Sequence, residues 1–173
     1  MLDLLMKRRS IRKFTDQNVT GAQVNQVLQA ALLSPTSRGL QSWEYIVVRD
    51  KKMLQQFGNC RQPKQGVLPE APVGIVVLGN PSVIDVWVED GSIALSNMWL
   101  EATDMGLGCC WVQIRNRLSN QNDMPSGDYI KQLLYIPDPY QVLAILALGY
   151  PSEKKQPLSL EQLPYNKIHM ERF

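Results

Sequence analysis

Residues 85–105, DVWVEDGSIALSNMWLEATDM, form the longest segment of the chain with helical patterning. The apolar residues of this segment wrap most of the way round an α-helix, and a helix with so little polar face is buried on two sides. Gly106 follows at the place where a helix often ends in a left-handed residue. The segment predicts a central helix that packs on its own core on one side and, on the other, against a second subunit.

Apolar segments before and after this helix predict the strands of a sheet. Residues 74–78 and 142–148 are apolar runs with the length of a buried strand. Residues 107–114 follow the helix directly, and Gly108 permits a close backbone approach there. Residues 45–48 predict one more strand.

Capping signals predict shorter helices around this core. Thr20 and Gln23 have the spacing of a capping box, and the helix behind them ends before Pro35. Asp50 and Ser126 are each positioned to cap a further short helix. The apolar stripe predicted for the helix behind Thr20 consists of Val24, Val27, Leu28, Ala31 and Leu32.

The size and composition are those of one domain. The chain has 173 residues, of which 45% are hydrophobic and 20% are charged, and a chain of this length buries roughly two thirds of its unfolded surface. No apolar run approaches the roughly 18–20 residues that cross a bilayer, and the basic N-terminus lacks the apolar core of a signal peptide. We expect a single domain over residues 1–173, no membrane contact and a cytoplasmic location.

Charge and cysteine content argue against several classes of site. The formal net charge of +2 is too small for a protein that binds nucleic acid through many phosphate contacts. Three cysteines without CxxC spacing and a single histidine, His169, argue against a disulfide framework, a metal site and a Ser-His-Asp triad. Cys109 and Cys110 lie in an apolar run and are expected to be buried.

A basic cluster stands near the N-terminus. Arg8-Arg9-Ser10-Ile11-Arg12 places three guanidinium groups and a hydroxyl within five residues. Residues 1–9 have helical spacing, so Arg8 and Arg12 share a face if the helix continues. Because arginine meets phosphate oxygens two at a time, the cluster indicates a phosphate site, with a solvated basic helix end as the alternative.

Two further segments are candidates for binding. Residues 34–43, SPTSRGLQSW, form a polar loop whose backbone N–H groups, hydroxyls and amide suit a ligand with many acceptors. The alternative, which the loop taken alone favours, is an ordinary connection from a helix to a strand. Residues 149–173 are too polar for a core of their own, and they are expected to lie across a surface of this chain or of a partner. Their apolar anchors are Leu158, Leu160, Leu163, Tyr165 and Phe173.

Taken together, these segments resemble the flavin-dependent nitroreductase family in its short form. The arginine cluster is similar to the family's phosphate- and flavin-binding motif, and residues 34–43 are similar to its second flavin-contacting motif. Residues 106–112, GLGCCWV, resemble the glycine-rich strand beside the isoalloxazine ring. Residues 149–155 with 167–169 resemble the family's ending. The motifs occur in the family's order and cover nearly the whole chain.

The resemblance implies an α+β fold with a mostly antiparallel central sheet flanked by helices. It also implies an intertwined homodimer in which the tail, residues 149–173, crosses onto the partner subunit, with two FMN molecules at the interface. Such a dimer explains both the central helix without a polar face and the tail without a core.

The resemblance also implies which residues bind the cofactor. Arg8, Arg9, Ser10 and Arg12 are expected at the phosphate, the ribityl chain and one ring edge, and Lys154 or Lys155 at the phosphate. The opposite subunit is expected to contribute Pro35, Thr36, Ser37, Gly39 and Gln41. The backbone of Val112, Gln113 and Ile114 is expected near the flavin N5. Gly39 departs from the family, which commonly has an asparagine there.

The implied reaction is ping-pong hydride transfer from NADH or NADPH to FMN and then to a nitroaromatic, a quinone or a similar conjugated small molecule. The cofactor carries this chemistry, so we expect no catalytic side chain. Residues 58–70 and 116–125 are predicted loops and the expected source of acceptor specificity. The alternatives are a dehalogenase or dehydrogenase of the same fold, or an FMN-binding or sensing protein without turnover.

Overall fold

A computed structural model describes all 173 residues. Its centre is an antiparallel sheet of four strands in the order β1-β2-β4-β3. The strands are β1 (Trp43–Val48), β2 (Val73–Gly79), β3 (Gly108–Gln113) and β4 (Gln141–Gly149). The two middle strands, β2 and β4, are buried along almost their whole length. The expected α+β class with an antiparallel sheet is confirmed.

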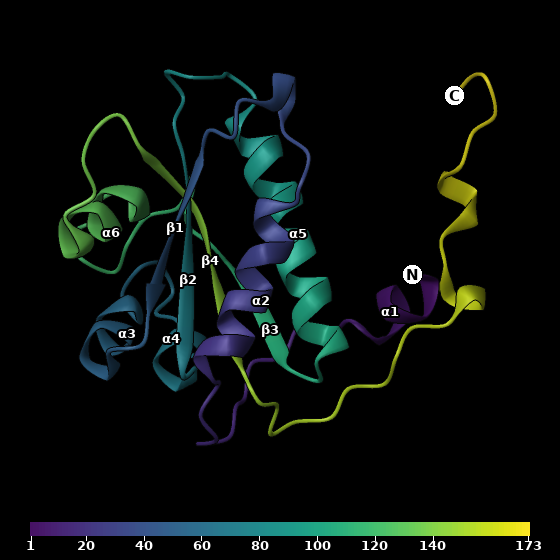
Figure 1. Cartoon of the computed structure of the whole chain (residues 1–173), viewed down its shortest axis with the longest axis horizontal. Helices are drawn as coiled ribbons and strands as arrows, with labels where there is room; N and C mark the ends of the chain where they lie inside the picture. The colour runs from purple at the N-terminus through teal and green to yellow at the C-terminus, as the bar shows by residue number, and fades with distance from the viewer.

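Helices cover both faces of this sheet. On one face α2 (Gly21–Leu32) and α5 (Trp87–Asp104) lie side by side, and the other face carries α3 (Lys51–Phe57), α4 (Val67–Glu70) and α6 (Ser126–Leu134) (Figure 1). Two apolar cores result, one on each face. The sheet therefore separates α5 from the three short helices.

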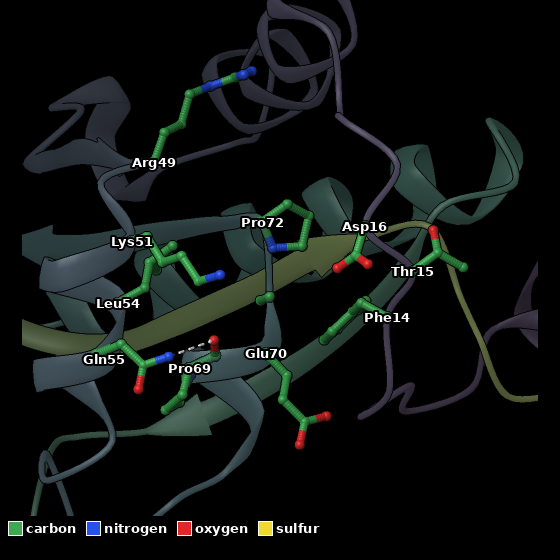
Figure 2. Close-up of a pocket in the computed structure, with 11 residues that line it drawn as sticks. Phe14, Thr15, Asp16, Arg49, Lys51, Leu54, Gln55, Pro69, Glu70 and Pro72 are labelled. Atoms are coloured by element: carbon green, nitrogen blue, oxygen red, sulfur yellow. Dashed lines mark hydrogen bonds between the residues drawn. The ribbon is translucent and has the colours of Figure 1, made fainter.

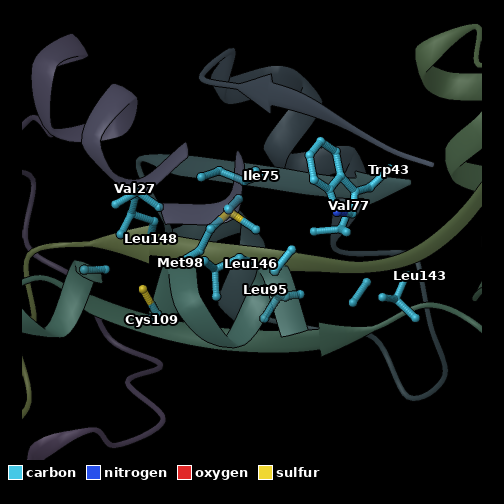
Figure 3. Packing of buried hydrophobic residues seen from close by; sticks show 14 of the residues in the cluster. Val27, Trp43, Ile75, Val77, Leu95, Met98, Cys109, Leu143, Leu146 and Leu148 are labelled. Atoms are coloured by element: carbon cyan, nitrogen blue, oxygen red, sulfur yellow. The ribbon is translucent and has the colours of Figure 1, made fainter. Parts of the chain in front are cut away.

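Strand periodicity divides the apolar side chains between the two cores. Along β2, Ile75 and Val77 belong to the core under α5, whereas Val76 and Leu78 belong to the opposite core, as expected from the alternation of side chains along a strand. Figure 3 shows Met98 of α5 among the side chains of the first core. The continuous apolar run of β2 follows from its burial on both sides.

Most predicted helix ends are confirmed. Thr20 and Gln23 form the complete capping box of α2, and the Asp50 carboxylate accepts the Met53 N–H of α3 at 2.8 Å. The central helix ends at Asp104, and Gly106 has a φ of +75°. These local signals position the helices because each supplies a backbone partner or a conformation that the end of a helix needs.

Three local predictions are wrong. Residues 58–70 are not entirely loop, because they include α4, which is too short to show a helical period. Ser126 lies inside α6 and caps nothing. Leu32 is 52% exposed although it belongs to the predicted stripe of α2, whose core contacts come from Val24, Val27, Leu28 and Ala31.

The N-terminal segment also differs from its prediction. Helix α1 (Leu2–Lys7) has no buried residue and stops before the arginines. Arg8 has an extended ψ of 119°, so Arg8 and Arg12 do not share a helical face. The chain becomes extended here because it pairs with β3: the Ile11 N–H donates to the Cys109 carbonyl at 2.8 Å.

The C-terminal tail leaves the sheet at the end of β4 and runs past α1 (Figure 1). It contains only two short 3₁₀ turns, Leu160–Gln162 and Tyr165–Lys167. All residues from 160 to 173 are exposed, Phe173 completely. No helix of the chain has both the length and the apolar character needed to span a bilayer.

Candidate functional site

The N-terminal arginine cluster, Arg8, Arg9 and Arg12, lies where the beginning of the chain meets the beginning of the tail. The Arg9 guanidinium donates to the Gln156 carbonyl, and the Arg12 N–H donates to the Glu153 carboxylate at 2.5 Å. Further along the tail, the Leu158 N–H donates to the Met6 carbonyl at 3.0 Å. Segments more than 140 residues apart in sequence thus form one basic site.

This site carries more positive charge than the chain itself neutralises. Glu153 accepts a hydrogen bond from the Arg12 N–H and lies 3.7 Å from the Lys155 amino group, and both contacts hold the pKa of its carboxyl below the usual range. The chain's other salt bridge, Lys131 with Asp138, involves α6. None of the three guanidinium groups forms a salt bridge with a carboxylate. An anion with several acceptor oxygens therefore fits this set of donors.

Arg8 is fixed against the central helix. Its guanidinium carbon lies 4.5 Å from the centre of the Trp99 ring, and Arg8 itself is half-buried. Stacking on an indole restricts a guanidinium while its N–H donors stay available at the edge. Ser10, beside it, forms a bridge with Cys109 of β3.

The open edge of β3 continues from this site. β3 is an edge strand, and Ile11 binds the Cys109 carbonyl on the side away from β4. Since backbone groups of alternate residues point to the same edge, those of Trp111 and Gln113 also face outward. The backbone groups of Val112 point to β4, where Val112 pairs with Ile145.

Among the residues expected near the flavin N5, Gln113 is the one with an outward N–H. The Ile114 N–H is engaged, because it donates to the Leu143 carbonyl at 3.3 Å. The Gln113 side chain is held in place by the Trp111 indole N–H, which donates to its amide oxygen at 2.8 Å. The arginine cluster and the outward Gln113 N–H thus lie along one strand edge.

The loop of Pro35, Thr36, Ser37, Gly39 and Gln41 lies elsewhere in the same chain. Its Ser37 N–H donates to the Asp90 carboxylate at 2.9 Å, near the start of α5. Arg8 rests on Trp99, nine residues further on, which is about 13 Å along a helix axis. One chain therefore does not bring the loop to the arginine cluster, and Figure 1 shows the loop at the far end of α5 from α1.

The backbone of this loop explains one departure from the family pattern. Arg38, Gly39 and Gln41 all have positive φ, and that of Gly39 is +67°. Asparagine tolerates this left-handed conformation better than most residues do. A Cβ built on Gly39 meets nothing within 4 Å. Glycine and asparagine therefore satisfy the same backbone requirement at this position.

Two polar residues of α5 that the sequence reasoning did not single out hold the loop. The Asn97 amide donates to the Ser34 hydroxyl at 2.8 Å, and Asp90 holds the Ser37 N–H. Asp90 is 4% exposed, and its second carboxylate oxygen has no partner within the chain. The available signal was their spacing, because polar residues seven apart on a largely apolar helix share one face.

The cysteines offer no nucleophile. Cys60, Cys109 and Cys110 are buried, as predicted for the adjacent pair. Burial raises the pKa of Cys60 to about 12 and raises those of Cys109 and Cys110. For Cys110 burial outweighs the opposing effect of the nearby Arg12 and Lys155 charges. These thiols are uncharged at neutral pH, and the thiolate is the reactive form.

A pocket of about 550 Å³ lies away from this site. Figure 2 shows that the Lys51 amino group and the Asp16 carboxylate extend into it. Arg49 and Glu70 add one further charge of each sign. None of the residues expected to bind the cofactor lines this pocket, so its size does not identify it as the functional site.

Comparison with known proteins gives consistent matches over the whole chain. The family model described as "Nitroreductase family" matches residues 5–60 and 54–150. The protein named "Putative NADH dehydrogenase/NAD(P)H nitroreductase" of Archaeoglobus fulgidus is 31% identical over 177 residues, which cover 99% of this chain and 98% of that protein. An FMN reductase (NADPH) of Bacillus subtilis is 28% identical over an alignment that covers 96% of this chain and 72% of that protein.

A solved structure gives the same result. The FMN-dependent nitroreductase of Clostridium difficile R20291 superposes with a TM-score of 0.96 at 41% identity, covering 100% of both chains. The similarity thus includes the tail as well as the sheet.

Proposed function

Because this chain belongs to the nitroreductase family, we propose that it is an FMN-dependent NAD(P)H oxidoreductase. The observation that carries the proposal is the N-terminal arginine cluster, whose three guanidinium groups form no salt bridge with a carboxylate. The tail contacts this cluster through hydrogen bonds to Arg9 and Arg12. The names of similar proteins support the same cofactor, since they include an FMN reductase and an FMN-dependent nitroreductase.

The residues present fit FMN in a definite order along the chain's surface. Arg8, Arg9, Ser10 and Arg12 hold the phosphate and the start of the ribityl chain. Lys155, rather than the exposed Lys154, joins them, because its amino group already lies in the cluster beside Glu153. The outward Gln113 N–H is then the backbone donor for the ring.

When bound, FMN supplies two-electron chemistry that takes a hydride from NADH or NADPH and passes it to a nitroaromatic, a quinone or a similar conjugated acceptor. The chain's own contribution is to bind and orient, which agrees with three buried, uncharged thiols and a single histidine. We assign no catalytic side chain.

We further propose that the active form is a homodimer. Large apolar side chains of α1 and of the tail are exposed in the single chain, including Leu2 at 61% and Met170 at 83%. Leu33, at the end of α2, is 85% exposed. A second copy that covers these surfaces also supplies the loop of residues 35–41, which one chain holds at the opposite end of α5 from its own arginines.

Anaerobic titration tests the proposed function. The purified protein, loaded with FMN, is mixed with NADH and then with NADPH, and the flavin absorbance is recorded. Bleaching by at least one donor, followed by recovery when a quinone or nitroaromatic is added, is the expected result. A fully loaded protein that neither donor bleaches would instead be a binding or sensing protein.

A further inference from the structure

A pair of arginines lies beyond the end of β3 that is opposite to the N-terminal arginine cluster. Arg115 and Arg117 line a pocket of about 270 Å³ together with Trp87, Asn116 and Gln141. The N-terminal arginine cluster adjoins Cys109, near the start of β3, and Arg115 follows its last residue by two positions. β3 thus runs from one basic site to the other over about 17–20 Å.

The backbone of this arginine pair is held firmly. The Arg115 N–H donates to the Leu143 carbonyl at 3.0 Å, and the Arg117 carbonyl accepts the Ser126 N–H at 2.8 Å. Trp87 is buried and packs directly against Gly79, where a Cβ would lie only 2.4 Å from its ring. The pocket is therefore preformed, and only its arginine side chains need to adjust.

The charges of the pocket favour an anion. Neither guanidinium forms a salt bridge, and Asp128 is the one carboxylate that lines the pocket. The Arg115 guanidinium lies 6.0 Å from the Trp87 ring centre, and Arg117 donates to the Asn116 carbonyl at 2.9 Å. These contacts use few of the five N–H donors that each guanidinium carries.

We propose that Arg115 and Arg117 bind a phosphate group of the nicotinamide dinucleotide. The inference rests on the proposed function. With the FMN phosphate at the N-terminal cluster, the ring would be held by the Gln113 N–H, at the end of β3. A hydride donor that met the ring there would have Arg115 and Arg117 next to it beyond Gln113. This pair supplies the arginine forks that bind phosphate oxygens.

The donors of the pocket suit a phosphate group, and the nicotinamide dinucleotide offers two kinds of phosphate. The pyrophosphate is common to NADH and NADPH, whereas the 2′-phosphate belongs to NADPH alone. If removing the two arginines weakens the binding of NADPH alone, the pair binds the 2′-phosphate. If it weakens the binding of both NADH and NADPH, the pair binds the pyrophosphate.

Rapid-reaction kinetics of flavin reduction test this proposal. The R115A single and R115A/R117A double variants are mixed anaerobically with NADPH or NADH, and the donor Kd and limiting rate are measured. We expect the Kd for at least one donor to rise about tenfold or more in the double variant, with the FMN content and limiting rate unchanged. Unchanged Kd values for both donors would overturn the proposal.

Two controls keep the outcome specific. Arg49→Ala removes an exposed arginine that forms no salt bridge and lies outside both sites, so its donor Kd values should match the parent protein. Arg115→Lys keeps the charge but not the fork, and it should recover part of the affinity. Thermal unfolding of each variant separates loss of the pocket from loss of the fold.

A binding measurement without flavin reduction separates this proposal from the proposed function. Calorimetry with 2′,5′-ADP and with ADP probes the phosphates without a nicotinamide. Weaker binding of either nucleotide to the double variant supports the pocket even if the parent protein is not reduced by either donor, an outcome that would defeat only the proposed function. Equal binding of both nucleotides to parent and variant would contradict the pocket.

Discussion

The two basic sites at the ends of β3 differ in how far the chain encloses them. At the N-terminal arginine cluster, Arg8 is stacked on Trp99 and the tail crosses over through Glu153 and Gln156. At the other end, Arg115 and Arg117 are exposed, and beyond their hydrogen-bonded backbone their guanidinium groups have only the Asn116 carbonyl and the distant Trp87 ring as neighbours. An enclosed site suits a cofactor that stays, and an open site suits a donor that arrives and leaves with each turnover.

Removing the tail should have the largest effect, because it changes the enclosed site and leaves the open one intact. Truncation after Tyr150 deletes Glu153, Lys155 and Gln156 from the enclosed site and deletes the exposed apolar tail, while Arg115 and Arg117 are unaffected. We expect loss of both FMN and the dimer, measured by flavin absorbance and molar mass in solution. A truncated protein that stays yellow and dimeric would refute the role given to the tail.

Single changes in the enclosed site should have the next largest effect. Arg12→Ala or Arg8→Ala removes charged hydrogen bonds worth roughly 1.5–3 kcal/mol each, so the FMN Kd should rise about 10- to 150-fold. Fluorescence titration with FMN measures this change, and circular dichroism checks the fold. Arg49→Ala is the matched control. Unchanged FMN retention in both variants would remove the cluster from the cofactor site.

Much of this arrangement was predictable from sequence, because its signals are local. The strands and the central helix follow from apolar periodicity, and the arginine cluster is contiguous in sequence. The extended backbone from Arg8 was not predictable, since it depends on pairing with β3, about 100 residues away. Asp90 and Asn97 were missed for a related reason: their importance comes from a loop that they meet only in the folded chain.

The arginines beyond β3 show the same limit. Residues 116–125 were expected to contribute to specificity, and Arg117 lies within that range, but Arg115 stands just before it. Its role as a pocket wall depends on Trp87, which is 28 residues earlier in the chain. Short α4 was missed because one helical turn carries no period.

Gly39→Asn should have a smaller effect, one that tests how the partner's loop completes the enclosed site. Asparagine tolerates the left-handed φ of +67° better than most residues, and the space around Gly39 is open. We expect an intact fold and FMN binding that is a few-fold tighter, since an amide adds about 0.5–1.5 kcal/mol per hydrogen bond. Gly39→Val is the strained control. An Asn variant with unchanged FMN affinity and flavin potential would argue that the loop does not reach the cofactor.

The smallest expected effect concerns the three buried thiols, two of which, Cys109 and Cys110, lie on β3 beside the enclosed site. Burial raises the pKa values of Cys60, Cys109 and Cys110, so the thiolate fraction at pH 8 is negligible. Mass spectrometry after iodoacetamide treatment should find no labelling of the folded protein at pH 8 and labelling of all three cysteines after unfolding. Labelling of Cys110 in the folded protein would show that the site is more open than its contacts indicate.

The most direct test of the enclosed, two-subunit cofactor site is light scattering with simultaneous flavin absorbance during gel filtration of the protein supplied with FMN. One peak at twice the chain mass of 19.6 kDa, carrying one flavin per chain, is the predicted result. A colourless species of single-chain mass would contradict both the assignment of the arginine cluster to FMN and the partner's contribution to its site.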